Sequence, residues 1–484
     1  MKTQFDVAII GAGPGGFDAA IRARELGFKT ALIDKAEAGG TCLNSGCIPT
    51  KSLLASTKLI SKINRAENYG LKGIGRGDAC VAPTTWDFAY LVERKNKVVE
   101  TLKKSMVDSV KRSGIEWISG TASLKGKNKL IIDCRGAASA PIERRGNPAP
   151  TLEIESSSII IATGSEPVPF PGVPFDGKRV LSSTQILELK TIPQSLLILG
   201  GGIVGVEFAS IFQALGVKVT IVEMLDRLIA TEDEDISRRL ESIFARKVIQ
   251  ILTGQKATLD SGKNFDADCV LDGIGRKPCV QNLGLEKIGI KMEKNGVQVN
   301  EYLETSVPGI FAIGDVTSRS TGLAHGASAE GIRVIENLKG PKKKMDYRAI
   351  PSCIYTDPEI ASVGARSPRP SQGGDTPPLQ NEIVECKIPF SAIGKSHVEG
   401  ETEGFIKMKA SRKDGKIIEV SGIGGHMTEI IHEAMVAIHL GVKAMDLAQM
   451  VHAHPTESEI LAKAAQKLVN IINVILRPRS GQRI

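Results

Sequence analysis

The chain has 484 residues, enough for about three domains of ordinary size. Hydrophobic residues make up 42% and charged residues 24%, and glycine is abundant with 50 copies, so the collagen, coiled-coil and disordered classes are excluded. The net charge of +8 arises from Lys and Arg interspersed with Asp and Glu, and it does not require a nucleic-acid surface.

The apolar runs and the cysteines indicate where the protein is located and whether disulfides stabilise it. The first apolar run, at 7–10, stops at a glycine, and the most apolar longer window, at 195–209, is broken by four glycines and Glu207. Neither fits a signal peptide or a membrane span, so we expect a cytoplasmic protein without membrane association. Eight thinly spread cysteines argue against a structural disulfide framework, and only Cys42 and Cys47 lie close enough to suggest chemistry.

The N-terminal segment has the pattern of a strand, a glycine-rich loop, a helix and a second strand. An apolar, β-branched run at 5–10 leads into the loop at 11–16. Helical periodicity follows at 17–26, and a second strand at 30–33 ends at Asp34. This order predicts a βαβ unit of the Rossmann-like kind that binds dinucleotides.

The same pattern returns in the middle of the chain. A strand at 195–199 precedes the glycine-rich loop at 200–205 and a helix, and a strand at 218–222 ends at Glu223. In both copies the acid follows the first glycine by 23 residues. One such loop is weak support, but two matched copies in the same context predict two bound dinucleotides.

The glycines and acids of these loops are the candidate cofactor contacts. The first glycine permits the tight turn, the second admits the pyrophosphate and the third lets helix pack on strand. These positions are Gly11, Gly13 and Gly16 in the first copy and Gly200, Gly202 and Gly205 in the second. Asp34 suits a ribose, and Glu223 would also repel a 2′-phosphate and so favours NAD over NADP, although Arg227 lies nearby. The alternative is two ordinary turns with incidental acids.

The cysteine pair favours redox chemistry over metal binding. Five helical residues advance about 7.5 Å, more than a disulfide spans, so a distorted turn is needed to bring Cys42 to Cys47. Gly46 and Pro49 make such a turn plausible. A tetrahedral zinc needs two more ligands, and no second close Cys or His pair follows nearby, so we expect no metal.

The composition of two segments predicts exposed insertions, and the region from about residue 350 onward predicts a further domain. The segments at 135–150 and 366–378 are rich in Gly, Ser, Pro and Arg and cannot bury enough surface to order themselves. A third domain begins near 350, where strand-like runs precede helical segments at 429–440 and 457–476.

Taken together, the motifs resemble the class I FAD-dependent pyridine nucleotide-disulfide oxidoreductases over nearly the whole chain, and within them the branch that oxidises dihydrolipoamide with NAD+. The resemblance is carried by residues 11–16, 42–51, 162–164, 200–207, 275–278, 312–315, 355–359 and 452–459. It implies an α/β fold with two Rossmann-like dinucleotide-binding domains and a C-terminal α+β dimerisation domain. The implied domains are FAD-binding at 1–155 and 280–348, NAD-binding at 156–279 and interface-forming at 349–484.

The resemblance also implies roles for individual residues. Cys42 and Cys47 form the redox disulfide, with Cys42 as the interchange thiol and Cys47 as the thiolate facing the flavin. Lys51 and Glu207 form an ion pair beside the flavin. The remaining flavin contacts are Asp34, Lys51, Thr163, Gly164, Gly314 and Asp315, and Gly275 joins the NAD contacts.

The same resemblance implies an acid/base residue and the binding partners of the protein. His454 exchanges protons with thiols, as imidazole can near neutral pH, and Glu459 orients it. The enzyme is expected to be a homodimer in which the C-terminal domain completes the partner's site. Its substrate would be a lipoyl-bearing carrier protein of a 2-oxo acid dehydrogenase or glycine cleavage complex. A lone histidine is more often structural, and we apply that interpretation to His325, His397, His426, His432, His439 and His452.

Several alternatives fit the sequence less well. Glutathione reductases are expected to carry basic residues where Glu223 stands, and mercuric reductases need a C-terminal cysteine pair, whereas no cysteine follows Cys386. Soluble transhydrogenases lack a complete cysteine pair. A rival from another class is a non-catalytic flavoprotein that binds a partner or nucleic acid through its basic surface and the tail at 477–479.

Overall fold

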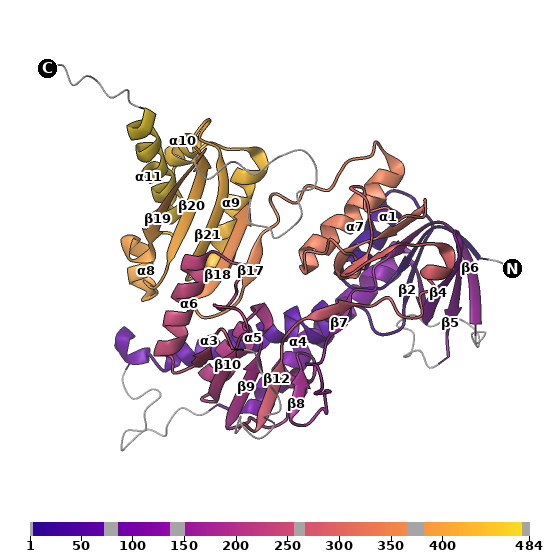
Figure 1. Ribbon diagram of the computed structural model, residues 1–484, viewed down its shortest axis with the longest axis horizontal. Coiled ribbons are helices and arrows are strands. Elements are labelled where there is room, and N and C mark those ends of the chain that lie inside the picture. The colour runs from indigo at the N-terminus through magenta and orange to yellow at the C-terminus, as the bar shows by residue number, and fades with distance from the viewer. Residues whose placement is uncertain (1–2, 72–85, 136–150, 256–266, 365–381, 477–484) are drawn as a thin grey trace. The chain divides into compact units, whose positions relative to one another are not determined.

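The computed structural model describes residues 3–71, 86–135, 151–255, 267–364 and 382–476 (Figure 1). The chain forms two compact units, each built from segments far apart in the sequence. Unit 1 consists of Met1–Ser56, Gly75–Ile192 and Ile274–Met345, and unit 2 of Thr57–Ile74, Pro193–Gly273 and Asp346–Ile484. The insertions predicted at 135–150 and 366–378, apart from Arg135, and the basic tail lie outside the described residues.

A seven-stranded sheet forms the centre of unit 1, in the order β3-β2-β1-β6-β5-β4, with β16 paired to β6. The β1, β2, β3, β6 and β16 pairings are parallel, whereas β4 and β5 run antiparallel. The strands are β1 (Thr3–Ile10), β2 (Thr30–Asp34), β3 (Glu116–Ser119), β4 (Thr121–Gly126), β5 (Lys129–Asp133), β6 (Thr151–Ile161) and β16 (Ile310–Ala312). The carboxyl ends of β1, β2 and β6 therefore meet at one edge, where the first glycine loop begins.

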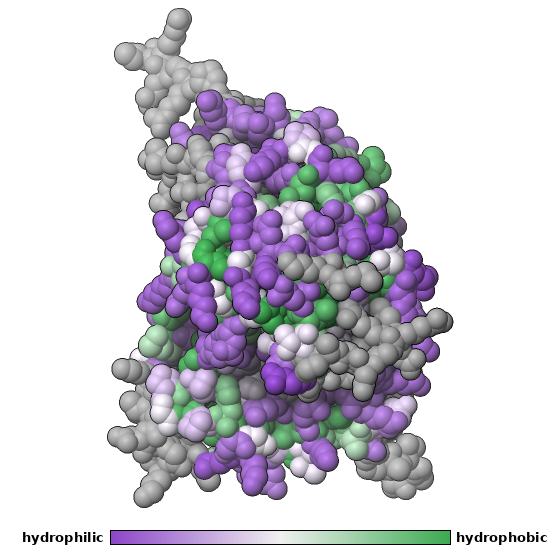
Figure 2. Space-filling view, turned by 90° about the vertical axis from the view of Figure 1, so that its right-hand side faces the viewer, coloured by the Kyte–Doolittle hydropathy of each residue, from purple (hydrophilic) through white to green (hydrophobic). Residues whose placement is uncertain are grey.

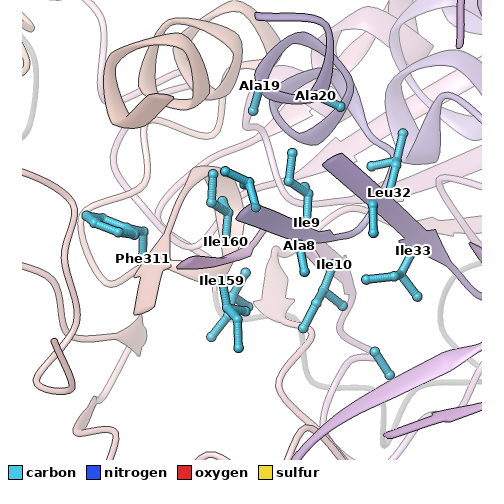
Figure 3. Packing of buried hydrophobic residues seen from close by; sticks show 14 of the residues in the cluster. Ala8, Ile9, Ile10, Ala19, Ala20, Leu32, Ile33, Ile159, Ile160 and Phe311 are labelled. Carbon is cyan, nitrogen blue, oxygen red and sulfur yellow. The ribbon is translucent and has the colours of Figure 1, made fainter. Parts of the chain in front are cut away.

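The core of unit 1 lies on both faces of this sheet. Figure 3 shows Ile9 and Ile10 of β1 between Leu32 of β2 and Ile160 of β6, and all four side chains are buried. Such continuous apolar runs are typical of parallel strands covered on both sides. Helices α1 (Pro14–Glu25) and α7 (Ala324–Lys339) lie side by side over one face (Figure 1).

Unit 1 also carries the segment with the cysteine pair. Helix α2 (Gly40–Ser45) ends at Gly46, and helix α3 (Cys47–Ile63) begins directly after it. The other elements of the unit are α4 (Phe88–Ser113), β7 (Ser165–Pro167), β8 (Val180–Ser182), β13 (Arg276–Pro278), β14 (Met292–Glu293) and β15 (Gly296–Val297). Short 3₁₀ helices lie at Gln185–Glu188, Glu286–Ile288 and Gly314–Val316.

Unit 2 begins with a second parallel βαβ arrangement. The strands β11, β10, β9 and β12 lie in that order and run parallel. The elements are β9 (Ser195–Leu199), α5 (Ile203–Ala214), β10 (Lys218–Val222), α6 (Glu234–Arg246), β11 (Gln250–Leu252) and β12 (Cys269–Asp272). Helix α5 is buried along most of its length, which matches its apolar sequence.

The C-terminal half of unit 2 is an antiparallel sheet in the order β17-β18-β21-β20-β19, against which α9 and α11 pack. The strands are β17 (Ser352–Ile354), β18 (Glu359–Gly364), β19 (Ile383–Pro389), β20 (Phe405–Ser411) and β21 (Ile417–Gly424). The helices are α8 (Gly394–Glu399), α9 (Met427–Leu440), α10 (Ala444–Gln449) and α11 (Glu459–Leu476). Ala, Ile and Leu side chains of α9 and α11 form one core with the sheet.

Buried charges join the two halves of unit 2. Asp233 caps the N-terminus of α6 and is 2% exposed, and Lys407 of β20 lies 3.2 Å from its carboxylate. Lys409 lies 3.7 Å from Asp233 and 2.8 Å from Glu419. Since a buried charge without its partner is strongly destabilising, this group holds α6 against the C-terminal sheet.

The structure confirms the predicted α/β fold class and both βαβ units. The predicted domain boundaries remain predictions; the one between 155 and 156 lies within β6, and unit 1 extends to Ile192. Among the described helices, none combines the length and apolar character needed to cross a membrane. On the face shown in Figure 2, hydrophilic side chains predominate and hydrophobic ones gather in small patches among them.

Candidate redox and nucleotide sites

The cysteine pair sits at a break between two helices. The backbone at Gly46 leaves the helical region with φ −141° and ψ −108°, so α2 ends there and α3 starts at Cys47. Thr50 donates its hydroxyl to the Gly46 carbonyl at 2.6 Å, which fixes the first turn of α3. The interruption supplies the distorted turn that the spacing of the two cysteines requires.

The break brings the two thiols together. Cys42 is half-buried, Cys47 is exposed, and their sulfur atoms share a hydrogen bond. That bond raises the pKa of Cys42, burial raises it further, and the positive charge of Lys51 opposes both effects. The pair is therefore arranged as a dithiol in which Cys42 holds its proton, next to a cation that stabilises a thiolate.

The first glycine loop lies against the end of β6. Gly11 has φ +109°, and a Cβ on it would lie 2.3 Å from the Ala162 carbonyl oxygen. A Cβ on Gly16 would lie 1.9 Å from the Gly11 carbonyl oxygen, and Gly13 caps α1. Gly11 and Gly16 therefore leave no room for a side chain, and the backbone N–H groups at the start of α1 lie next to this tight loop, where an anion can bind.

Asp34 closes this loop from the next strand. Its carboxylate accepts from the backbone N–H of Ala12 at 2.6 Å and of Ala36 at 2.8 Å. A cleft in unit 1 is lined by Gly11, Asp34 and Thr163, together with Ile10, Ile33, Lys35, Gly120, Thr121, Ala122, Glu166, Cys279, Gln281 and Leu283. The cleft combines apolar walls with an acid and open backbone, and these residues fit the nucleotide part of FAD.

A second corner of the predicted flavin site lies at the end of β16. Gly314 has φ +66°, and its N–H donates to Glu330 at 2.7 Å. The carboxylate of Asp315 accepts from the hydroxyls of Ser165 at 2.7 Å and Ser320 at 3.1 Å. The sequence analysis named Gly314 and Asp315 but not Glu330 and Ser165, which hold them through these hydrogen bonds.

Neighbouring loops complete this corner. Thr163 donates its hydroxyl to the Cys279 carbonyl at 2.7 Å, and Gly164 has φ +69°. Gly275, with φ +152°, accepts at its carbonyl from Val168 N–H at 3.1 Å. Thr163 and its partner Cys279 thus both line the cleft of unit 1.

The second glycine loop repeats the first in detail. Gly200 has φ +98°, a Cβ on Gly205 would lie 2.0 Å from the Gly200 carbonyl oxygen, and Gly202 caps α5. Glu223 accepts from the N–H groups of Gly201 at 2.6 Å and Leu225 at 2.7 Å. The same steric cradle and acid fit a second dinucleotide, here in unit 2.

The predicted acid/base pair is formed in unit 2. His454 Nδ1 lies 2.7 Å from Glu459 Oε1, and Glu459 is the first residue of α11. The side chain of His454 is 77% exposed and that of Glu459 16% exposed. The carboxylate accepts the Nδ1 proton, which leaves Nε2 facing outward without a partner in the described part of the chain.

Lys51 and Glu207 are placed in different units. Lys51 lies in the second turn of α3, in unit 1, and Glu207 is a buried residue of α5, in unit 2. One oxygen of Glu207 accepts from the N–H of Tyr355 at 2.9 Å. The ion pair between Lys51 and Glu207 remains a prediction.

Comparison with known proteins matches this arrangement. Residues 5–331 match the family model of pyridine nucleotide-disulphide oxidoreductases, and residues 350–465 match the dimerisation domain of that family. The chain belongs to the pyridine nucleotide-disulphide oxidoreductase family. It is an oxidoreductase with the dimerisation domain of that family at its C-terminus.

Relatives of this oxidoreductase match along nearly their full length. A dihydrolipoyl dehydrogenase from Bacillus subtilis is 37% identical over 483 residues, covering 96% of this chain and 98% of that protein. A dihydrolipoyl dehydrogenase from Chlamydia muridarum is 38% identical over 479 residues, covering 96% and 97%.

Solved structures show the same fold. LpdA from Mycobacterium tuberculosis has a TM-score of 0.83 at 24% identity, covering 96% of this chain and 99% of that one. The HOCl-induced flavoprotein disulfide reductase RclA from Escherichia coli has a TM-score of 0.77 at 27% identity, covering 95% and 99%.

Proposed function

We propose that this oxidoreductase is an NAD+-dependent dihydrolipoyl dehydrogenase that oxidises a protein-bound dihydrolipoyl group and acts as a homodimer. The observation that carries the proposal is the cysteine pair at the helix break, with Cys42 and Cys47 in contact. The near full-length identity to dihydrolipoyl dehydrogenases and the match to a dimerisation domain support it.

The cofactors follow from the two glycine cradles. Gly11, Gly13, Gly16 and Asp34, together with Thr163, Gly164, Gly314 and Asp315, would hold FAD in unit 1. Gly200, Gly202, Gly205 and Glu223 would hold NAD in unit 2. When bound, these cofactors supply two-electron transfer from the reduced cysteines to NAD+. The chain's own contribution is to fix both nucleotides, hold the cysteine pair and move protons.

Thiol–disulfide exchange is the step that the chain's residues carry out. One thiol of the dihydrolipoyl group loses its proton to Nε2 of His454 from the partner subunit and attacks the Cys42 sulfur of the oxidised pair. The Cys42–Cys47 bond breaks, a mixed disulfide forms and Cys47 leaves as a thiolate beside Lys51. The second substrate thiol then attacks the substrate sulfur of the mixed disulfide, and its proton passes to Cys42, which leaves as a thiol. This releases the cyclic disulfide and leaves Cys42 as a thiol and Cys47 as a thiolate.

Glu459 makes His454 suitable for this work. By accepting the Nδ1 proton it fixes the tautomer whose Nε2 is unprotonated and ready to receive a proton. It also stabilises the imidazolium that forms. His454→Gln is expected to slow the thiol half-reaction by roughly a hundredfold or more, the usual contribution of a positioned general base.

The deciding experiment measures which donor and which acceptor the purified protein uses. We expect dihydrolipoamide to reduce NAD+, with reduced glutathione as donor and NADP+ as acceptor both poor, and Cys42→Ser and Cys47→Ser inactive. Turnover only with glutathione and NADP+ would contradict the proposal and indicate a glutathione-type reductase. A flavoprotein without thiol turnover but with salt-sensitive nucleic-acid binding would indicate the non-catalytic alternative.

The partner and location are proposals of the same kind. A lipoyl-bearing carrier protein of a 2-oxo acid dehydrogenase or glycine cleavage complex is the expected source of the dithiol, in the cytoplasm. The same lipoyl chemistry serves all of these complexes, so isolated lipoyl domains from each would have to be compared as substrates.

A further inference from the structure

A second histidine–carboxylate pair lies two residues before His454. His452 Nε2 lies 2.8 Å from Oε1 of Glu433 on α9, and His452 Nδ1 lies 3.2 Å from the carbonyl oxygen of Met450. The His452 side chain is only 12% exposed, in contrast to 77% for His454. Two histidines of one loop are thus placed in opposite environments.

The hydrogen bonds of His452 and His454 show that only His454 can accept a proton from the substrate. A carbonyl oxygen only accepts, so His452 Nδ1 donates, and Nε2 faces a carboxylate that also accepts. With both ring nitrogens engaged, His452 has no nitrogen left to receive a substrate proton. His454, in contrast, uses Nδ1 for Glu459 and keeps Nε2 for exchange.

The loop that carries His454 has few other contacts to hold it. Val451 is 98% exposed, and Ala453 and Pro455 are exposed as well. Thr456 donates to the Ala453 carbonyl at 2.8 Å, which tightens the loop internally but fixes it to nothing else.

Besides the hydrogen bond of His454 to Glu459 on α11, two side chains connect the loop to other described elements of unit 2. After His454, Glu457 accepts from the hydroxyl of Ser396 on α8 at 2.7 Å. Before His454, the connection is the pair of His452 with Glu433. Within the described residues, the N-terminal side of the loop is therefore tied to α9 through one hydrogen bond to a carboxylate.

We infer that His452 and Glu433 are positioning residues that hold the His454 loop on α9, so that His454 Nε2 is presented to the substrate thiol at the right place. The inference rests on the proposed function, because it assigns proton transfer to His454. Misplacement of a catalytic group by about 1 Å can reduce the rate roughly a hundredfold, so a single anchoring pair is able to control the thiol half-reaction.

The test separates the two half-reactions in the holoenzyme. Flavin reduction by dihydrolipoamide depends on His454, whereas flavin reduction by NADH does not use it, and both are followed by stopped-flow absorbance. His452→Asn keeps a donor near Nδ1 but loses the bond to Glu433, and Glu433→Ala removes the acceptor. Glu433→Gln keeps an acceptor oxygen, and His432→Gln changes an exposed histidine on the same helix as the matched control.

We expect His452→Asn and Glu433→Ala to slow reduction by dihydrolipoamide about tenfold or more and to leave reduction by NADH within about twofold. Glu433→Gln should recover most of the rate, and His432→Gln should match the wild type. Equal slowing of both half-reactions, or no slowing of either, would overturn the inference. If Glu433→Ala fails to fold by circular dichroism, the contrast between His452→Asn and Glu433→Gln decides.

The His454→Gln variant distinguishes a failure of the positioning role of His452 from a failure of the proposed function. If it slows the thiol half-reaction while His452→Asn does not, the positioning role fails and the proposed function stands. If His454→Gln itself leaves the thiol half-reaction unchanged, the proposed role of His454 fails, and the positioning role falls with it.

Discussion

Asp34 and Glu223 hold their glycine loops in the same way. Each carboxylate accepts from the N–H of the residue after the first glycine, at 2.6 Å in both cases, and from the N–H two residues beyond the acid, at 2.8 and 2.7 Å. The acid therefore fixes the distance between the loop and the end of the neighbouring strand before any nucleotide binds. Such preorganisation reduces the cost of binding.

Glu223 provides a test of nucleotide choice. We expect Glu223→Ala to raise KM for NAD+ about ten- to a hundredfold, because hydrogen bonds to a charged group contribute about 1.5–3 kcal/mol. Glu223→Gln keeps an acceptor and should raise it less, while both variants lose the repulsion of a 2′-phosphate and use NADP+ better. Steady-state kinetics with both nucleotides measure this. Asp226→Ala, at an exposed acid nearby, is the control, and unchanged nucleotide preference in Glu223→Gln would contradict the prediction.

The matched glycines allow the two nucleotide sites to be disabled separately. A Cβ would lie 1.9 Å from a carbonyl oxygen in Gly16→Ala and 2.0 Å in Gly205→Ala, so each loop must shift at a cost of about 1–3 kcal/mol. We expect Gly16→Ala to lose flavin during purification. Gly205→Ala should keep its flavin and bind NAD+ weakly, as measured by the flavin to protein absorbance ratio and by NADH titration.

A control for backbone effects is Gly126→Ala, where the nearest atom to a new Cβ is 3.9 Å away. It should retain both nucleotides. If Gly16→Ala kept its full flavin content, the first loop could not be the flavin cradle.

We expect the buried Glu330 to affect the affinity for FAD, although it is a support for Gly314 and not one of the predicted flavin contacts. It is 1% exposed and holds Gly314 through a 2.7 Å hydrogen bond, next to Asp315. We expect Glu330→Ala to weaken FAD binding about tenfold or more, since a buried N–H left without a partner costs about 1–3 kcal/mol. Release of flavin fluorescence on dilution measures the affinity. Glu336→Ala, at a half-exposed residue of the same helix, should retain FAD, and equal loss in both variants would mean that α7 itself is destabilised.

The sequence was sufficient for features that depend on local pattern. Apolar strands, glycine loops and the acids at 34 and 223 follow one another within about 25 residues, so short-range spacing alone predicts each βαβ unit. The break at Gly46 likewise followed from the distance that two cysteines must span. These features are encoded by neighbouring residues, which is why they could be found without a structure.

Contacts between distant segments could not be predicted in this way. Ser165 and Asp315 lie 150 positions apart and meet only because β6 and β16 are neighbours in one sheet. The pair of His452 with Glu433 joins a loop to a helix, and each residue alone reads as an ordinary surface residue. β6 likewise lies in unit 1 because it pairs with β1, a strand about 150 positions earlier in the chain.

Lys51 should set the pH at which the reduced cysteines become reactive. Its charge lowers the pKa of Cys42, in opposition to the hydrogen bond to Cys47 and to burial. Removing that charge in Lys51→Met destabilises the thiolate form, so the pKa of the dithiol rises, and the rate of alkylation by iodoacetamide should reach half its maximum at a higher pH, by roughly one pH unit or more. Lys62→Met, in the last turn of the same helix, is the control and should not move the profile. A shift to lower pH, or an equal shift in both variants, would show that Lys51 does not stabilise the thiolate.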